Sequence, residues 1–224
     1  MVRVFTVPPA ESGDHVPATR DGTLTLSDRV KITATARQTA RMTRVIAGVA
    51  RGRRLSVPPG TTTRPTSDRA REGLFSSLQS LLDLDGARVL DLYAGSGALG
   101  LEAVSRGAAS ATLVEADPDA VAALRANVAH LAFRQAYVVA QPVERFLAAD
   151  AEPRYDLALL DPPYELDVVP VLELLLPWLA PDAVVAVERR TRGPELTWPE
   201  GYEPVRERRY GEATLWYALL ASPS

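Results

Sequence analysis

Two short segments carry the residue types that could bind a nucleotide-like ligand and act on it. The first, Gly95-Ser96-Gly97-Ala98-Leu99-Gly100, follows an apolar run and precedes an amphipathic one. This is the strand, turn and helix order of a nucleotide-binding turn, in which glycines let a ligand lie against the backbone. Glu115 ends the next apolar run, where a carboxylate can accept hydrogen bonds from ribose hydroxyls. Taken alone, the glycine pattern also fits a helix entry that binds nothing.

The second segment is Asp161-Pro162-Pro163-Tyr164, which directly follows the apolar run 157–160. We therefore expect it at the carboxyl end of a strand, where α/β sheets bind ligands. The exocyclic amine of a nucleobase is a poor nucleophile, because its lone pair is delocalised into the ring. The Asp161 carboxylate and the Pro162 carbonyl can accept its two N–H groups, while Tyr164 stacks on the base. The structural alternative is a proline-rich loop, but the two segments together predict methyl transfer from S-adenosylmethionine.

The cofactor is expected to lie across the glycine loop with its ribose on Glu115. Asp91, at the end of the preceding strand, is expected to hold the cofactor amino group through water, the alternative being a cap for the glycine turn. Asp117 is interpreted as a helix N-cap instead of a ligand. The cofactor-binding residues predicted at this stage are Asp91, Tyr93, Ala94, Gly95, Gly97, Glu115, Ala116 and Asp161.

The two segments must be positioned by the strands and helices of a larger fold. Apolar runs alternate with amphipathic ones after Asp85-Gly86, which predicts a doubly wound, mostly parallel sheet of an α/β protein. Two final runs flank Tyr210-Gly211-Glu212 and predict the antiparallel C-terminal hairpin that distinguishes a seven-stranded class I methyltransferase sheet from a dinucleotide dehydrogenase. The predicted strands are 88–92, 111–115, 136–140, 156–160, 183–188, 202–209 and 213–220, and the predicted helices are 67–82, 98–106, 118–131, 143–149 and 168–179.

The part of the chain that precedes this α/β fold is basic, although the net charge of the whole chain is -3. Residues 43–57 predict a β-hairpin with arginines on one face, turning at Gly48 and Gly52. Residues 1–41 lack periodicity and are expected to be a disordered extension, with the natural start at Met42. The alternative is a basic arm that folds on RNA. The predicted domains are thus 1–41, an RNA-binding hairpin and loop at 42–66, and a class I methyltransferase domain at 67–224.

Arginines crowd the stretch 37–71, in which Asp68 is the only acid. Such a block ahead of an acidic domain predicts a polyanion-binding face, against the alternative of a solvated basic surface. The residues expected to contact RNA are Arg44, Arg51, Arg53, Arg54, Arg64 and Arg71, with Arg64 nearest the cofactor and target base.

Composition excludes several classes of protein. The chain has no cysteine and two histidines far apart, which excludes disulfides and thiolate zinc sites and argues against a histidine metal cluster. No apolar run approaches the length of a membrane span. We therefore expect a cytoplasmic protein without metal or membrane contact. A monomer is also expected, although nothing in the composition determines the oligomeric state.

With these motifs the chain resembles the RsmD family of bacterial 16S rRNA (guanine-N2)-methyltransferases, from about residue 44 to the terminal hairpin. The segments that carry the resemblance are RVIAG and RGRRL within 44–55, TRPTSDRAREGLF at 63–75 and DLYAGSGALGLEAVSRGA at 91–108. The resemblance implies a class I S-adenosylmethionine-dependent methyltransferase with a small N-terminal RNA-binding hairpin. It also implies methylation of the exocyclic N2 amine of the guanine at rRNA position 966, with 16S rRNA or a small-subunit assembly intermediate as partner.

One departure from the family concerns the cofactor adenine. The family usually carries an acidic or Asn residue followed by Ala after the third strand, where this chain has Gln141-Pro142-Val143. The main-chain N–H of Val143 is expected to serve instead, and Val143 completes the predicted cofactor set.

Other functions remain open at this point. Another amino-methyltransferase, acting on DNA adenine-N6 or protein glutamine, is disfavoured by the RPT and RGRRL segments. A non-catalytic RNA-binding assembly factor is disfavoured by the intact Asp161 and Tyr164. A nicotinamide oxidoreductase would have no use for the Asp-Pro-Pro-Tyr segment.

Overall fold

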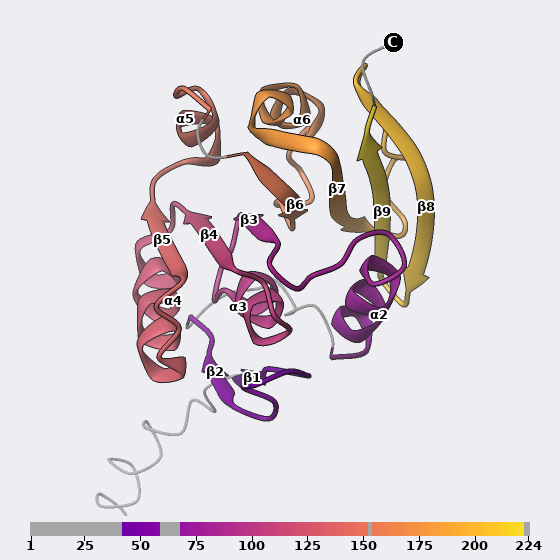
Figure 1. The fold of residues 1–224 in the computed structure, drawn as a ribbon. Helices are drawn as coiled ribbons and strands as arrows, with labels where there is room; N and C mark the ends of the chain where they lie inside the picture. The colour runs from indigo at the N-terminus through magenta and orange to yellow at the C-terminus, as the bar shows by residue number, and fades with distance from the viewer. Residues whose placement is uncertain (1–41, 59–67, 152–153, 222–224) are drawn as a thin grey trace, which may run out of the picture. The chain divides into compact units, whose positions relative to one another are not determined.

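Residues 42–58, 68–151 and 154–221 are described by a computed structural model, shown in Figure 1. Within these residues one sheet of seven strands has the order β5-β4-β3-β6-β7-β9-β8. The first five strands of this order run parallel, and β9 is antiparallel to both β7 and β8. The strands are β3 (Arg88–Leu92), β4 (Ser110–Glu115), β5 (Ala136–Ala140), β6 (Tyr155–Leu160), β7 (Leu179–Arg190), β8 (Tyr202–Tyr210) and β9 (Ala213–Leu220). This arrangement confirms the predicted class I methyltransferase sheet with its antiparallel C-terminal hairpin.

Helices cover both faces of this sheet. Figure 1 shows α2, α3 and α4 on one side of the strands and α5 and α6 on the other. The strands alternate accordingly, because successive side chains point to opposite faces: Leu157 packs with the first group, and Ala158 packs with the second. The helices are α2 (Asp68–Leu78), α3 (Ala98–Ser105), α4 (Pro118–Leu131), α5 (Val143–Leu147) and α6 (Val169–Leu175), followed by the 3-10 turn η1 (Leu176–Trp178).

The predicted N-terminal hairpin is present as two short antiparallel strands, β1 (Met42–Arg44) and β2 (Arg54–Ser56). Its connection folds onto α3, where the Glu102 carboxylate accepts from the main-chain N–H groups of Ile46 at 2.6 Å and Ala47 at 2.9 Å. Gly48 has a φ of 79°, and a Cβ there would lie 1.7 Å from the Ser105 carbonyl oxygen. Glycine is therefore required for the connection to approach α3 this closely.

Most predicted element boundaries agree with the structure to within a few residues: α2 ends at Leu78 and α5 at Leu147, ahead of the predicted 82 and 149, and larger differences arise around prolines. The helix predicted at 168–179 ends as an α-helix at Leu175, since Pro177 has no main-chain N–H to continue it. Strand β7 begins at Leu179, ahead of the predicted residue 183, and passes through Asp182 at a φ of 60°. The β6–β7 register shifts between Tyr155 and Leu157, which marks an irregularity that alternation of residue types does not show. The predicted extension 1–41 and Ser67, the first residue of the helix predicted at 67–82, lie outside the described residues.

Candidate active site

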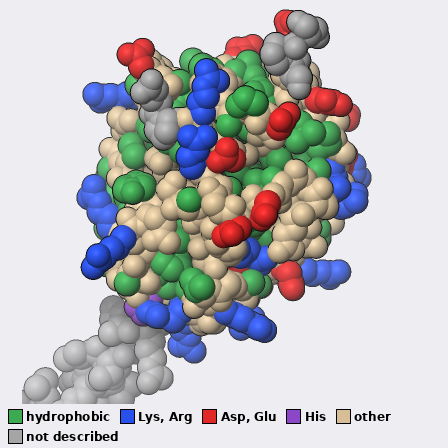
Figure 2. All heavy atoms as spheres, in the orientation of Figure 1, with side chains coloured by type: hydrophobic (Ala, Val, Ile, Leu, Met, Phe, Trp, Pro, Cys, Tyr) green, Lys and Arg blue, Asp and Glu red, His purple; other side chains and the backbone are tan. Residues whose placement is uncertain are grey.

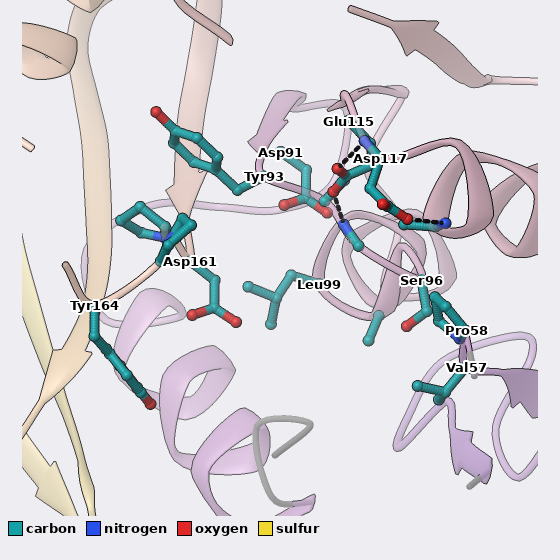
Figure 3. A pocket seen from close by; sticks show the side chains of 16 residues that line it. Val57, Pro58, Asp91, Tyr93, Ser96, Leu99, Glu115, Asp117, Asp161 and Tyr164 are labelled. Atoms are coloured by element: carbon teal, nitrogen blue, oxygen red, sulfur yellow. Dashed lines mark hydrogen bonds between the residues drawn. The ribbon is translucent and has the colours of Figure 1, made fainter. Parts of the chain in front are cut away.

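A pocket of about 260 Å³ lies at the carboxyl ends of β3, β4 and β6. Figure 3 shows the side chains that line it, with Asp161 and Tyr164 on one side, Glu115 and Asp117 on the other, and Leu99 between them. The glycine loop and the Asp-Pro-Pro-Tyr segment therefore face the same cavity. Of the predicted site residues, the lining includes Asp91, Tyr93, Ala94, Gly95, Glu115, Asp161, Pro162 and Tyr164.

The glycines of the loop have different structural roles. Gly95 has a φ of 55°, and a Cβ added there would meet no atom within 4 Å, so this glycine keeps space open at the pocket wall. Gly97 has a φ of 81°, and its Cβ would lie 2.4 Å from Leu124 of α4. Gly100 allows α3 to approach β4, because a Cβ there would lie 2.6 Å from Leu113. Only Gly95 of these three lines the pocket, while the other two allow close packing.

Glu115 is held by main-chain donors at the end of β4. Its Oε2 accepts from Gly95 N at 2.7 Å, and its Oε1 accepts from Ala116 N at 2.8 Å and Asp117 N at 2.9 Å. A carboxylate has about four lone-pair sites, so about one acceptor position remains for a ligand hydroxyl. Asp117 accepts from Ala120 N at 2.8 Å, which confirms its predicted role as the N-cap of α4.

Asp91 is a buried carboxyl group at the floor of the pocket. It is 1% exposed, and its Oδ2 accepts from Gly100 N at 2.8 Å. Burial raises the pKa of Asp91 to about 7; the Gly100 hydrogen bond lowers this pKa, and the charge of Glu115 adds to the rise. A cationic group entering the pocket would favour the ionised form of this carboxyl.

The Asp-Pro-Pro-Tyr segment forms the loop after β6. Figure 3 shows the Asp161 carboxylate and the Tyr164 ring facing the same end of the cavity. The guanidinium carbon of Arg190 lies 4.7 Å from the centroid of the Tyr164 ring, a cation–π contact that covers one ring face. Burial raises the pKa of Tyr164, and the charges of Glu188 and Asp161 raise it further, so its hydroxyl is neutral near pH 7.

Three predicted cofactor residues do not line this cavity. Gly97 and Ala116 flank lining residues. The Val143 side chain is buried in the apolar core on the side of the sheet that α5 and α6 cover. Val57 and Pro58, which follow β2, line the cavity instead. No local signal in the sequence could have placed them there, because the approach of β2 to the pocket is a long-range contact. Leu99 could have been anticipated, since it lies inside the glycine motif.

The predicted RNA-binding arginines have different environments. Arg51 and Arg54 are exposed, and Arg53 is exposed but donates to the His130 carbonyl at 2.6 Å. Arg44 is exposed and pairs with Asp68 at 2.9 Å. Figure 2 shows basic side chains at the end of the molecule where Figure 1 places β1 and β2, with acidic side chains nearer the middle of this face.

Arg71, the other arginine of this set that the structure describes, is not displayed on this surface. Arg71 is fully buried and donates to the Arg44 carbonyl and to Asp68 Oδ1, each at 2.8 Å. Contact between Arg71 and RNA therefore remains a prediction. Such a contact requires a rearrangement that exposes the guanidinium. Arg64 lies outside the described residues. Within the described ranges, no group of three or more His, Cys, Asp or Glu residues could hold a metal ion, and no helix is long and apolar enough to cross a membrane.

Comparisons with known proteins agree with this geometry. A family model described as Conserved hypothetical protein 95 matches residues 43–219. Ribosomal RNA small subunit methyltransferase D of Escherichia coli (strain K12) is 40% identical over 172 residues, which cover 75% of this chain and 85% of that protein. The solved structure of yhhF from Escherichia coli is 37% identical with a TM-score of 0.72, and the match covers 80% of this chain and 98% of that one.

A more distant structure shares the fold alone. It is the 16S rRNA N2 G1207 methyltransferase of Thermus thermophilus, solved in complex with AdoMet and guanosine. Its sequence is 23% identical, its TM-score is 0.60, and the match covers 81% of this chain and 50% of that chain.

Proposed function

This chain belongs to the RsmD family, whose members include ribosomal RNA small subunit methyltransferase D, and from that membership we propose that it methylates the N2 amine of a guanine in 16S rRNA. The family supplies the general activity of an rRNA methyltransferase, while the target amine and the use of S-adenosylmethionine are the proposal. The observation that supports it is the convergence of the glycine loop and the Asp161–Tyr164 segment on one pocket. We assign RNA binding to residues 42–66 and methyl transfer to residues 67–224.

The pocket residues fit S-adenosylmethionine in the chemistry of their donor and acceptor groups. The buried Asp91 carboxyl suits the ammonium end of the cofactor, and the remaining acceptor position of Glu115 suits a ribose hydroxyl. Gly95 leaves room for a ligand at the turn. When bound, the cofactor supplies an electrophilic methyl group, which passes to the amine nitrogen while the carbon–sulfur bonding pair stays on sulfur.

The protein's part in the reaction is to orient the amine and remove its proton. The Asp161 carboxylate and the Pro162 carbonyl each accept one N–H of the guanine amine, which directs the nitrogen lone pair at the methyl carbon. Once nitrogen has four bonds it becomes acidic, and a carboxylate oxygen of Asp161 takes the proton and later releases it to solvent. Tyr164 stacks on the base with the ring face that Arg190 does not cover.

A guanine paired in an rRNA helix already uses one N–H of its amine in the base pair and cannot offer both to the two acceptors, so the target base must be single-stranded or flipped out. The hairpin arginines are suited to hold the flanking backbone, because phosphate contacts position a nucleic acid. Strand β2 leads from Arg54 through Ser56 directly into Val57 and Pro58 at the pocket wall. An RNA held along β2 would therefore lie next to the site of methyl transfer.

The proposed function is tested by mapping methylated guanines in small-subunit rRNA from cells with and without the gene. We expect one N2-methylguanine to be missing without the gene and restored by the wild-type chain. Restoration is expected to fail with Asp161→Ala and to succeed with Arg154→Ala, which changes a side chain at the opposite end of β6. An unchanged set of methylguanines, or loss of a methylated DNA adenine instead, would refute the assignment.

A further inference from the structure

Arg189 of β7 binds the loop that follows β6 through the main chain of the loop. Its Nη1 donates to the Pro163 carbonyl at 3.1 Å, and its Nη2 donates to the carbonyls of Tyr164 at 2.8 Å and Leu166 at 3.0 Å. The register explains this contact. Val187 pairs with Leu160, the last residue of β6, so Arg189 lies just beyond the pair, beside the loop.

The placement of this guanidinium is unusual for an arginine. Arg189 is 9% exposed, and burial of a charged group is costly unless hydrogen bonds replace its contacts with water. In the part of the chain that the structure describes, no carboxylate lies within 4 Å of it, and its hydrogen bonds go to main-chain carbonyls. The rigid, planar fork of a guanidinium can bridge several acceptors at once, which a lysine ammonium on a flexible stem does less well.

The loop needs such an external donor because its own sequence supplies few. Pro162 and Pro163 have no main-chain N–H, and a main-chain hydrogen bond within the loop runs from Leu166 N to the Pro163 carbonyl at 3.0 Å. Its attachment to β3, from Asp161 N to the Leu92 carbonyl, is long at 3.5 Å. The three bonds from Arg189 are therefore the main polar contacts that fix the loop carbonyls among the described residues.

These bonds divide the carbonyls of the loop into two groups. Those of Pro163, Tyr164 and Leu166 are occupied by Arg189, whereas no described residue donates a hydrogen bond to the Pro162 carbonyl. Pro162 carries the carbonyl that the mechanism assigns to the target amine. We propose that Arg189 is a positioning residue for methyl transfer: it fixes the loop so that the Pro162 carbonyl remains the acceptor for the amine. This inference rests on the proposed function.

The neighbouring residue contributes to the same loop in a different way. Arg190 contacts the ring of Tyr164, while Arg189 binds its main chain. Consecutive residues of one strand thus fix both the backbone and the side chain of the residue that is proposed to stack on the base. A displacement of about 1 Å at a reacting group can reduce a rate by about 10²-fold.

The test compares Arg189→Ala and Arg189→Lys with the control Arg154→Ala, which removes an arginine–carbonyl bond to Leu179 at the far end of β6. Hydrogen exchange reports the protection of the Leu166 amide, and single-turnover methylation of 16S rRNA reports the chemical step. In Arg189→Ala we expect lost protection at Leu166 with β6 still protected, a rate about 10- to 100-fold lower, and a much smaller loss of cofactor affinity. Arg189→Lys is expected to lie between Arg189→Ala and the wild-type protein in both measurements, and the control to match the wild type.

The two measurements separate this inference from the proposed function. Unchanged protection of the Leu166 amide in Arg189→Ala, or a single-turnover rate equal to that of the control, would overturn the role of Arg189. If the wild-type protein methylates an adenine amine instead of guanine, the proposed function fails, but the same rate comparison on that amine still decides the role of Arg189. Equal losses in rate and cofactor affinity would show a general structural role and would also overturn the inference.

Discussion

Asn127 of α4 binds both main-chain polar groups of Ser56 in β2. Its Oδ1 accepts from Ser56 N at 2.8 Å, and its Nδ2 donates to the Ser56 carbonyl at 2.9 Å. The same Nδ2 donates to the carbonyl of Ser96 in the glycine loop at 2.9 Å. One buried side chain therefore joins the basic hairpin to the turn at which the cofactor is expected to bind.

Asn127→Ala is expected to weaken both the fold and the cofactor site. It leaves half-buried main-chain groups of Ser56 and Ser96 without this partner, and the cost should lie near the lower end of the about 1–3 kcal/mol found for unsatisfied buried groups. Thermal unfolding should therefore show a lower midpoint, and calorimetric titration should show weaker binding of S-adenosylmethionine. Arg125→Ala, an exposed change on the same helix, is the matched control. Equal stability of the two variants would show that the Asn127 contacts contribute nothing.

Glu115→Ala should weaken binding of S-adenosylmethionine by about 1–3 kcal/mol, the cost of losing a hydrogen bond to a charged acceptor. The substitution also removes the acceptor that holds Gly95 N, so the glycine loop itself is expected to loosen. Calorimetric titration measures the affinity, and circular dichroism checks the fold. Unchanged affinity in a folded Glu115→Ala protein would remove Glu115 from the cofactor site.

Asp91 should make cofactor binding depend on pH. Because burial raises its pKa from 3.8 to about 7, its carboxyl is largely protonated below pH 7 in the free protein. A bound ammonium group favours the ionised form, so affinity for S-adenosylmethionine should rise as pH increases through 7. Calorimetry between pH 6 and pH 8 measures this rise, which should be absent in Asp91→Asn. A wild-type affinity as flat as that of Asp91→Asn would exclude a direct or water-mediated contact with the amino group.

The same ionisation has the opposite effect on the fold itself. A carboxyl whose pKa is higher in the folded than in the unfolded protein stabilises the fold most below its unfolded pKa of 3.8. That contribution is lost as pH rises through about 7. As pH rises through about 7, the contribution of Asp91 to stability should fall while the affinity for the cofactor should rise. The opposite directions distinguish the two effects experimentally.

The basic hairpin should make RNA binding depend on salt. If about four phosphates are neutralised, the logarithm of affinity should fall against the logarithm of salt concentration with a slope of about -3 for single-stranded RNA. Replacement of Arg51, Arg53 and Arg54 by alanine should flatten this slope without changing cofactor affinity. Fluorescence anisotropy with a labelled rRNA fragment measures both slopes. An unaltered slope in the triple variant would mean that the RNA is held elsewhere.

The sequence predicted the parts of the site that follow from local pattern and sheet geometry. Asp161 and Gly95 follow apolar runs, and the carboxyl ends of neighbouring parallel strands must meet at one edge of the sheet. The N-cap role of Asp117 was also predictable, because capping depends on residues within one turn.

Contacts between distant side chains and main-chain groups could not be predicted in the same way. Asn127, Arg189 and Glu102 each bind main-chain atoms that lie far away along the chain, and neither periodicity nor composition records such contacts. The burial of Arg71 was unpredictable for the same reason, since a run of arginines suggests an exposed surface.

Asp161 is proposed to orient the target amine and to take its proton. Methylation of 16S rRNA by purified wild-type protein, Asp161→Ala, Tyr164→Ala and Tyr164→Phe should be measured under single-turnover conditions, with cofactor affinity measured in parallel. We expect Asp161→Ala to lose turnover far more than cofactor affinity, because its carboxylate is proposed to act on the target amine. Tyr164→Phe should be milder than Tyr164→Ala, since stacking survives. Methylation by Asp161→Ala at the wild-type rate would contradict the proposed mechanism.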